Sequence, residues 1–66
     1  MDIKKRFGAT VKQVRIRVGI SQEELALRIE ADQAYVSRLE AGNMNVTLET
    51  IEQIADALEV KVRSLL

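Results

Sequence analysis

The side chains of this sequence offer little with which to do catalysis. The 66 residues include no cysteine and no histidine, which removes the usual ligands of structural zinc and every nucleophile–histidine pair. The adjacent carboxylates of Glu23 and Glu24 lie on one predicted helix surface, where we interpret them as solvated. No glycine-rich loop for cradling phosphate is present. The sequence therefore argues against an enzyme, and we expect neither a metal nor a cofactor.

The most informative residues are instead those that begin two short helices in succession. Ser21 followed three residues later by Glu24 is a capping box at a helix start. Asp32 then caps a further helix, and its carboxylate suits the positive end of the helix dipole. We therefore predict helices at about 22–29 and about 33–41, joined by a tight turn.

Two short helices joined by a tight turn are the signature of a helix-turn-helix, here at residues 21–41. An α-helix has about the width of the DNA major groove, and the N-terminal end of the second helix of such a motif meets base edges. Small helical bundles that bind other proteins also have short capped helices. From this pattern alone, both a DNA-binding domain and a protein-interaction bundle stay open.

The helices that must position this motif are indicated by apolar residues spaced three and four apart. They predict a first helix at about 2–18, a fourth at about 48–58 that is capped by Thr47, and a last short turn at about 62–66. The predicted inward stripes are Ile3, Phe7, Val11, Val14 and Val18 in the first helix and Leu48, Ile51, Ile54, Ala55 and Leu58 in the fourth. Strand periodicity is absent, so we predict one all-α domain over residues 1–66, a compact bundle of about five short helices.

The three glycines mark different features of these helices. Gly19 and Gly42 follow the first and third helices, where a left-handed residue commonly ends a helix. Gly8 lies inside the first helix, where glycine costs about 1 kcal/mol relative to alanine. We therefore expect tertiary packing to hold the first helix in place.

Charge is distributed unevenly along a chain whose net charge is zero. Residues 1–20 carry six basic side chains against one acidic side chain, whereas residues 21–66 carry four against nine. This asymmetry predicts one basic and one acidic face, although ordinary surface charge that happens to segregate explains it as well. Apolar runs are only a few residues long, so we expect no membrane span and no secretory signal, and we expect a cytoplasmic location.

Several segments, spread over almost the whole chain, match the sequence pattern of one known family at the same spacing. They are Gly19-Ile20-Ser21-Gln22-Glu23-Glu24-Leu25-Ala26, Tyr35-Val36-Ser37-Arg38-Leu39-Glu40-Ala41-Gly42, Thr47-Leu48-Glu49-Thr50-Ile51 and Ile54-Ala55-Asp56-Ala57-Leu58. In this register the chain resembles the Cro/lambda-repressor (Xre) family of bacterial and phage regulators. The resemblance implies a sequence-specific regulator of transcription that binds double-stranded DNA through its third helix.

The resemblance also assigns roles to the exposed face of the third helix. Gln33 matches a base-contacting position, and a glutamine there can pair with adenine N6 and N7; the alternative is a solvated side chain. Ala34 can touch a thymine methyl group. Ser37 and Arg38 follow one turn later, and Arg38 contacts either guanine O6 and N7 or a phosphate.

Other residues match positions that hold the DNA backbone. Gln22 matches a glutamine that touches a phosphate and braces the recognition helix. Asn43 and Asn45 match the loop that follows this helix, with simple turn chemistry as the alternative. Tyr35 lies at the DNA-facing rim in this family or packs partly in the core, and Arg17 is either a phosphate contact or a solvated residue.

Arg15 and Glu40 match a half-buried ion pair that, in the family, locks the recognition helix to the scaffold. Removing one partner would strand a charge at a cost of several kcal/mol, so we interpret the pair as structural. The chain departs from the family at Glu30, because glycine usually stands in the turn before the third helix. Either this turn avoids positive φ or Glu30 tolerates it at some cost.

A single domain of this kind contacts one half-site, so we expect a homodimer on an operator with paired half-sites about one helical turn apart. The apolar residues near the end of the sequence exceed what so small a core can bury; they are Val60, Val62, Leu65 and Leu66. We predict that part of this end, with the fourth helix, forms an isologous dimer interface. The alternative is that all four residues close the core of a single chain.

Within the family, the small size and the loop Asn45-Val46-Thr47-Leu48 look like the controller proteins of restriction–modification systems, many of which carry a basic residue where Met44 stands. An antitoxin of a toxin–antitoxin pair, a prophage regulator and a stand-alone repressor stay open. By the same resemblance, Glu23 on the second helix is a candidate contact for RNA polymerase.

Overall fold

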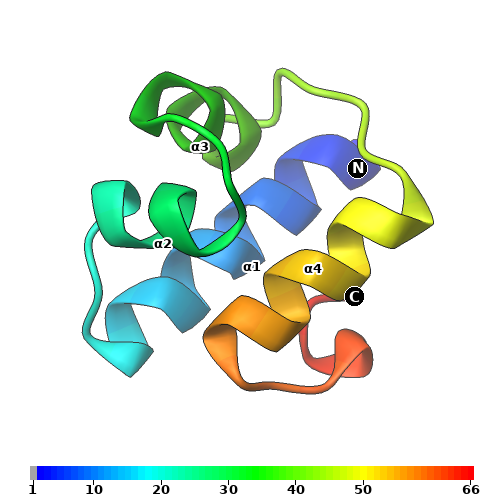
Figure 1. Cartoon of the computed structure of the whole chain (residues 1–66). Coiled ribbons are helices and arrows are strands. Elements are labelled where there is room, and N and C mark those ends of the chain that lie inside the picture. Colours follow the sequence, from blue (N-terminus) through cyan, green and yellow to red (C-terminus); the bar gives the residue numbers. More distant parts are fainter. Residues whose placement is uncertain (1) are drawn as a thin grey trace.

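The computed structural model describes residues 2–66, and Met1, with which the predicted domain range begins, lies outside them. These residues form four α-helices and one 3₁₀ turn, without a strand: α1 (Ile3–Val18), α2 (Gln22–Arg28), α3 (Gln33–Glu40), α4 (Leu48–Leu58) and η1 (Val62–Ser64). Helix α3 packs on α1, α2 packs against α3 and α4, and α4 also contacts α1 (Figure 1). The prediction of an all-α bundle with a helix-turn-helix is confirmed, although the last turn is 3₁₀ and shorter than expected.

Each α-helix begins at a side-chain cap, because the first N–H groups of a helix have no partner within it. The capping oxygens belong to Asp2, Ser21, Asp32 and Thr47. The predicted capping box is only half correct. Ser21 Oγ accepts from Glu24 N at 3.0 Å, but the Glu24 carboxylate accepts from Arg28 Nε at 2.9 Å instead of reaching back to the Ser21 N–H. A charged partner one turn along the helix is the stronger donor.

Four residues with positive φ end or connect the helices. Gly19 (φ 90°) and Gly42 (φ 80°) occupy the predicted helix ends. The turn between α2 and α3 holds Glu30 at φ 58°, so the turn does not avoid positive φ and the glutamate tolerates it. Glu59, after α4, has the same φ of 58°, which its sequence context did not indicate. Side chains with a Cβ are disfavoured in this conformation, so both glutamates carry local strain.

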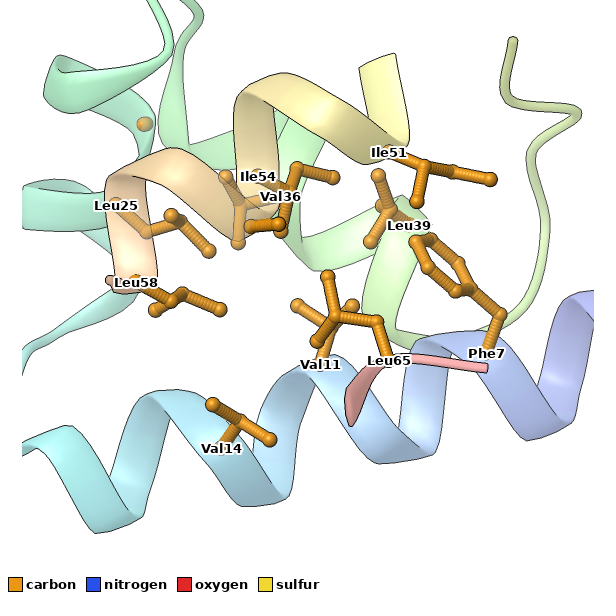
Figure 2. Close-up of a cluster of buried hydrophobic side chains, with 12 residues drawn as sticks. Phe7, Val11, Val14, Leu25, Val36, Leu39, Ile51, Ile54, Leu58 and Leu65 are labelled. Atoms are coloured by element: carbon orange, nitrogen blue, oxygen red, sulfur yellow. The ribbon is translucent and has the colours of Figure 1, made fainter. Parts of the chain in front are cut away.

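The core lies between α1 and α4, and α2, α3 and the C-terminal turn contribute side chains to it (Figure 2). Its large fully buried members are Leu25, Ile54, Leu58, Leu65, Val11 and Val36. The predicted stripes were wrong at their ends, because Ile3 is 59% exposed, Val18 42% and Leu48 80%. These residues lie at the ends of their helices, beyond the part of each helix that the other elements cover.

Leu65 corrects the predicted dimer interface. It is only 1% exposed and belongs to the core of a single chain, because the C-terminal turn packs against α4 (Figure 1). Val60 is half-buried against the same core. Val62 and Leu66 stay 38% and 50% exposed. The apolar end is therefore divided between closing the core and facing solvent. No helix among residues 2–66 has the length and apolar character needed to cross a membrane.

Candidate nucleic-acid interface

The predicted base-contacting residues share the exposed face of α3. Gln33, Ala34, Ser37 and Arg38 are all exposed, whereas Val36 is 1% exposed. These four positions lie on one side of the helix because one turn separates the first pair from the second. The opposite side of α3 is anchored in the core, so its polar face is presented to solvent at one side of the bundle (Figures 1 and 2).

A chain of side-chain hydrogen bonds runs from the interior to this face. Arg15 donates to the Glu40 carboxylate through Nε at 2.7 Å and through Nη2 at 3.1 Å. Gln22 Nε2 donates to Glu40 Oε1 at 3.0 Å, and Gln33 Nε2 donates to Gln22 Oε1 at 2.9 Å. This arrangement leaves Gln33 with its Oε1 and one Nε2 hydrogen, which are the two groups that pairing with adenine requires. The hydrogen bonds that begin at the buried Arg15–Glu40 pair therefore fix the orientation of the exposed Gln33 amide.

The anchor of this chain is the Arg15–Glu40 ion pair. Both residues are 8% exposed, and Arg15 Nη1 also donates to the backbone oxygen of Ile20 at 2.9 Å. Desolvating two charges is costly, so such a pair needs several hydrogen bonds to be tolerated. Within residues 2–66, every buried side-chain nitrogen and oxygen has a partner. The pair connects the C-terminal end of α3 to α1 and to the segment that leads into α2.

The residues predicted to contact the DNA backbone are placed at different parts of the molecule. Gln22 is half-buried at the first residue of α2, and Asn43 and Asn45 are exposed in the loop between Gly42 and α4. Tyr35 is half-buried and packs against the core with part of its surface open. Arg17 is exposed on the last turn of α1 and shares no hydrogen bond or ion pair with the other candidates among the described residues.

A further interaction holds α2 in place and was not predicted. Arg28 Nη1 donates to the backbone oxygen of Ala57 in α4 at 3.0 Å, while its Nε pairs with Glu24. The spacing of Glu24 and Arg28 is typical of a pair on one helix face. The contact with Ala57 joins positions 29 residues apart, and no spacing in the sequence indicates it. It fixes the first helix of the helix-turn-helix against the opposite side of the bundle.

Comparison with known proteins agrees with this geometry. A family model described as helix-turn-helix matches residues 11–65. The control protein C.BamHI from Bacillus amyloliquefaciens is 39% identical over 66 residues, which cover 98% of this chain and 82% of that protein. The crystal structure of the restriction–modification controller protein C.AhdI from Aeromonas hydrophila superposes with a TM-score of 0.90 at 38% identity, covering 98% of this chain and 93% of that chain.

A third similar structure is that of a protein–DNA complex. It is the C.Esp1396I controller tetramer in complex with its natural 35 base-pair operator, with a TM-score of 0.87, 28% identity and coverage of 98% of this chain and 86% of that chain. The family match spans most of the sequence, and both the fold and the sequence similarity extend over nearly the full length. The chain therefore belongs to the helix-turn-helix family of Cro/lambda-repressor-like (Xre) transcription regulators.

Proposed function

We propose that this chain is a sequence-specific DNA-binding regulator whose α3 enters the major groove. The observation that carries the proposal is the hydrogen-bonded path from Arg15 through Glu40 and Gln22 to Gln33. A long exposed side chain usually samples several rotamers, and fixing it costs entropy. Here the interior has already restricted Gln33, so its amide is pre-organised to meet a rigid partner such as a base edge.

The roles of the other residues follow from their positions around Gln33. Ala34, Ser37 and Arg38 extend the base-contacting face, with Arg38 directed to guanine. Contacts with the DNA backbone come from residues before, within and after α3. Their candidates are Gln22, Tyr35, Asn43, Asn45 and Arg17.

We propose that the functional unit is a homodimer on paired half-sites. Leu48 and Val62 line one shallow hollow together with Ile51, Glu49 and Glu52, and Leu48 is the most exposed large apolar residue among those described. Leu66 adds exposed apolar surface at the end of the same C-terminal segment. The similar C.Esp1396I controller, which assembles as a tetramer on its operator, supports paired binding.

The regulated genes are those of a restriction–modification system, and the protein acts in the cytoplasm of a bacterium or of a phage host. The similar C.BamHI and C.AhdI controller proteins support this assignment over an antitoxin. Genes for a restriction enzyme or a methyltransferase beside the coding sequence are the expected genomic context. A neighbouring toxin gene in their place would contradict the assignment.

Selection of bound sites from random double-stranded DNA tests the DNA-binding proposal. We expect enrichment of a sequence with two symmetric half-sites, and an affinity that falls steeply as salt is raised, because lysine and arginine contacts release counterions. Failure to enrich any sequence at low or moderate salt would contradict sequence-specific binding.

RNA polymerase is the second proposed partner. Glu23 is exposed on the first turn of α2, on the same element that the Gln22 contacts hold beside α3. A protein bound at a promoter would therefore present this carboxylate next to its DNA-facing surface. We expect Glu23→Lys to lower promoter-reporter activity while operator binding stays unchanged. Equal reporter activity at equal operator occupancy would contradict the polymerase contact.

A further inference from the structure

We infer that Gly8 is a positioning residue for α3, because the absence of a side chain there lets the C-terminal end of α3 rest directly on the backbone of α1. The inference rests on the proposed DNA-binding function, and it adds to that function the residue that sets the distance of α3 from α1. Gly8 is buried in the interior of α1 and makes none of the polar contacts described above.

The contact at Gly8 leaves no room for a methyl group. A Cβ built on Gly8 would lie 2.3 Å from the backbone oxygen of Leu39, 2.7 Å from that of Glu40 and 2.9 Å from the Glu40 carbonyl carbon. Carbon and oxygen approach no closer than about 3.3 Å in a favourable contact, so the two helices would have to separate by about 1 Å. All three obstructing atoms are backbone atoms, and no change of rotamer can move them.

A second contact of the same kind lies three residues earlier on α1. A Cβ on Gly42 would lie 2.6 Å from both Cα and Cγ of Lys5. Gly8 and Arg15 are separated by seven residues, so they lie on the same face of α1, and Arg15 holds the Glu40 side chain there. The end of α3 is therefore held on α1 by close backbone contacts at Lys5 and Gly8 and by one ion pair at Arg15.

The low helix propensity of glycine indicates that Gly8 is needed for its close contact with the backbone of α3. Glycine is a poor helix former and alanine the best, and alanine is otherwise well suited to a buried helix position. A buried glycine within a 16-residue helix therefore works against the stability of that helix. The structure shows what it provides, which is a separation of the helix backbones that no other residue allows.

Separation at this point would move α3 more than α1. Helix α1 is twice as long and contributes Phe7, Val11 and Val14 to the core, whereas α3 has eight residues and is followed by an irregular loop. A shift of about 1 Å exceeds the range of donor–acceptor distances that a hydrogen bond tolerates. The base-contacting face would then be presented at the wrong height, while much of the core would remain packed.

The test compares Gly8→Ala with Ala9→Gly. Ala9 is exposed next to Gly8, so its replacement weakens α1 without touching α3. The probes are a duplex with the site enriched from random DNA and a scrambled duplex of the same length. For Gly8→Ala we expect the ratio of affinities for the two duplexes to fall by about tenfold or more, as for a mismatched base pair. Ala9→Gly should keep the wild-type ratio at temperatures where it is folded.

A DNA-free measurement separates this inference from the proposed function. In the free protein, Gly8→Ala should shift backbone amide resonances throughout α3, whereas Ala9→Gly should shift mainly those of α1. A wild-type affinity ratio together with unshifted α3 resonances would overturn the inference even if the protein binds its operator normally. If Gly8→Ala shifts the α3 resonances but the wild-type chain enriches no DNA site, the displacement of α3 is supported and the DNA-binding proposal is contradicted.

Loss of folding is the remaining outcome, and a stabilised background addresses it. Glu59→Gly relieves a positive φ far from α3 in the sequence and gives such a background. Gly8→Ala in this background should fold, as judged by circular dichroism, and show the lowered ratio. If it remains unfolded there, Gly8 supports the core as a whole and the positioning role is wrong.

Discussion

At the scale of single residues, the useful distinction is between side chains that would contact DNA and side chains that orient them. Gln33 is exposed, yet its amide hydrogen-bonds to Gln22, which in turn hydrogen-bonds to a buried carboxylate. An exposed polar residue on a helix is ordinarily interchangeable with others. A side chain that is restrained as Gln33 is should not be interchangeable with others, because folding has already fixed its partner, Gln22.

Replacing Gln33 should therefore change specificity as well as affinity. We expect Gln33→Ala to cost about 1–3 kcal/mol of binding free energy on the enriched operator and to relax the preference at one base position. Gln53→Ala removes an exposed glutamine from α4 and serves as the control, which should leave binding unchanged. Competition binding against operators substituted at single positions measures both effects. A uniform loss on all sequences would contradict a base contact.

The Arg15–Glu40 pair should behave as a structural element. Arg15→Met strands the Glu40 carboxylate, and we expect the free energy of unfolding to fall by about 3–5 kcal/mol. The exposed Glu24–Arg28 pair offers a matched control, since Glu24→Gln keeps the Arg28 contact with Ala57 and should cost only about 0–1 kcal/mol from the ion pair. Denaturant titration compares the two variants. Similar losses of unfolding free energy in both variants would show that burial does not determine how much an ion pair contributes to stability.

Replacing both partners separates stability from orientation. An Arg15→Met, Glu40→Leu double variant should recover most of the lost stability, because well-packed apolar side chains can replace a buried ion pair. It should still discriminate poorly between operator and scrambled DNA, since Gln22 would lose its acceptor. Recovered discrimination would mean that Gln33 needs no support from the interior.

At the scale of elements, the sequence predicted the helices well because their signals are local. Ser21, Asp32 and Thr47 cap the helices as expected, and Gly19 and Gly42 end them. The errors arose where tertiary packing decides the outcome. Leu48 fits the apolar period of α4 but lies beyond the part of the helix that the other elements cover.

The two glutamates at positive φ were partly visible in the sequence. Glu30 stands where the family has glycine, which indicated a special turn, whereas nothing around Glu59 marked it before the structure showed φ 58°. Glu30→Gly and Glu59→Gly should each raise the free energy of unfolding by up to about 1 kcal/mol, because glycine adopts this conformation without strain.

An exposed residue with ordinary helical geometry supplies the control for this prediction. Gln13 is exposed in the middle of α1, and Gln13→Gly should lower the free energy of unfolding by about 1 kcal/mol. Thermal unfolding of the three variants gives opposite signs if the conformation at positions 30 and 59 is strained. Destabilisation by all three changes would show that the side chains of Glu30 and Glu59 contribute more than their strain removes.

At the scale of the whole molecule, the candidate site could be predicted only in part. The resemblance indicated the Arg15–Glu40 pair, the bracing role of Gln22 and the base contact of Gln33 as separate features, and the structure joins them into one hydrogen-bonded path. That connection depends on how α1, α2 and α3 pack, which no spacing along the sequence encodes. The close contact at Gly8 was missed for the same reason, although a glycine inside a helix was a visible signal.

The structure also changes the charge balance available for DNA. Arg15 is buried against Glu40, so one of the six basic residues in the first 20 positions contributes little to the outer surface. A chain with zero net charge gains little non-specific affinity from electrostatics. Tight operator binding should therefore depend on two copies that bind together, and this makes the dimer interface decisive.

Val62 tests that dependence because it is apolar, exposed and outside the core. We expect the wild-type chain to sediment as a dimer at micromolar concentration and Val62→Glu to sediment as a monomer, since a two-fold interface would bring two buried charges together. Binding to a paired operator should fall by about a hundredfold, whereas binding to a single half-site should not change. Ile16→Glu, at an apolar residue of α1 that is more exposed than Val62, should alter neither property. A monomeric wild-type chain that still binds the paired operator tightly would exclude this interface and assign the affinity to the single domain.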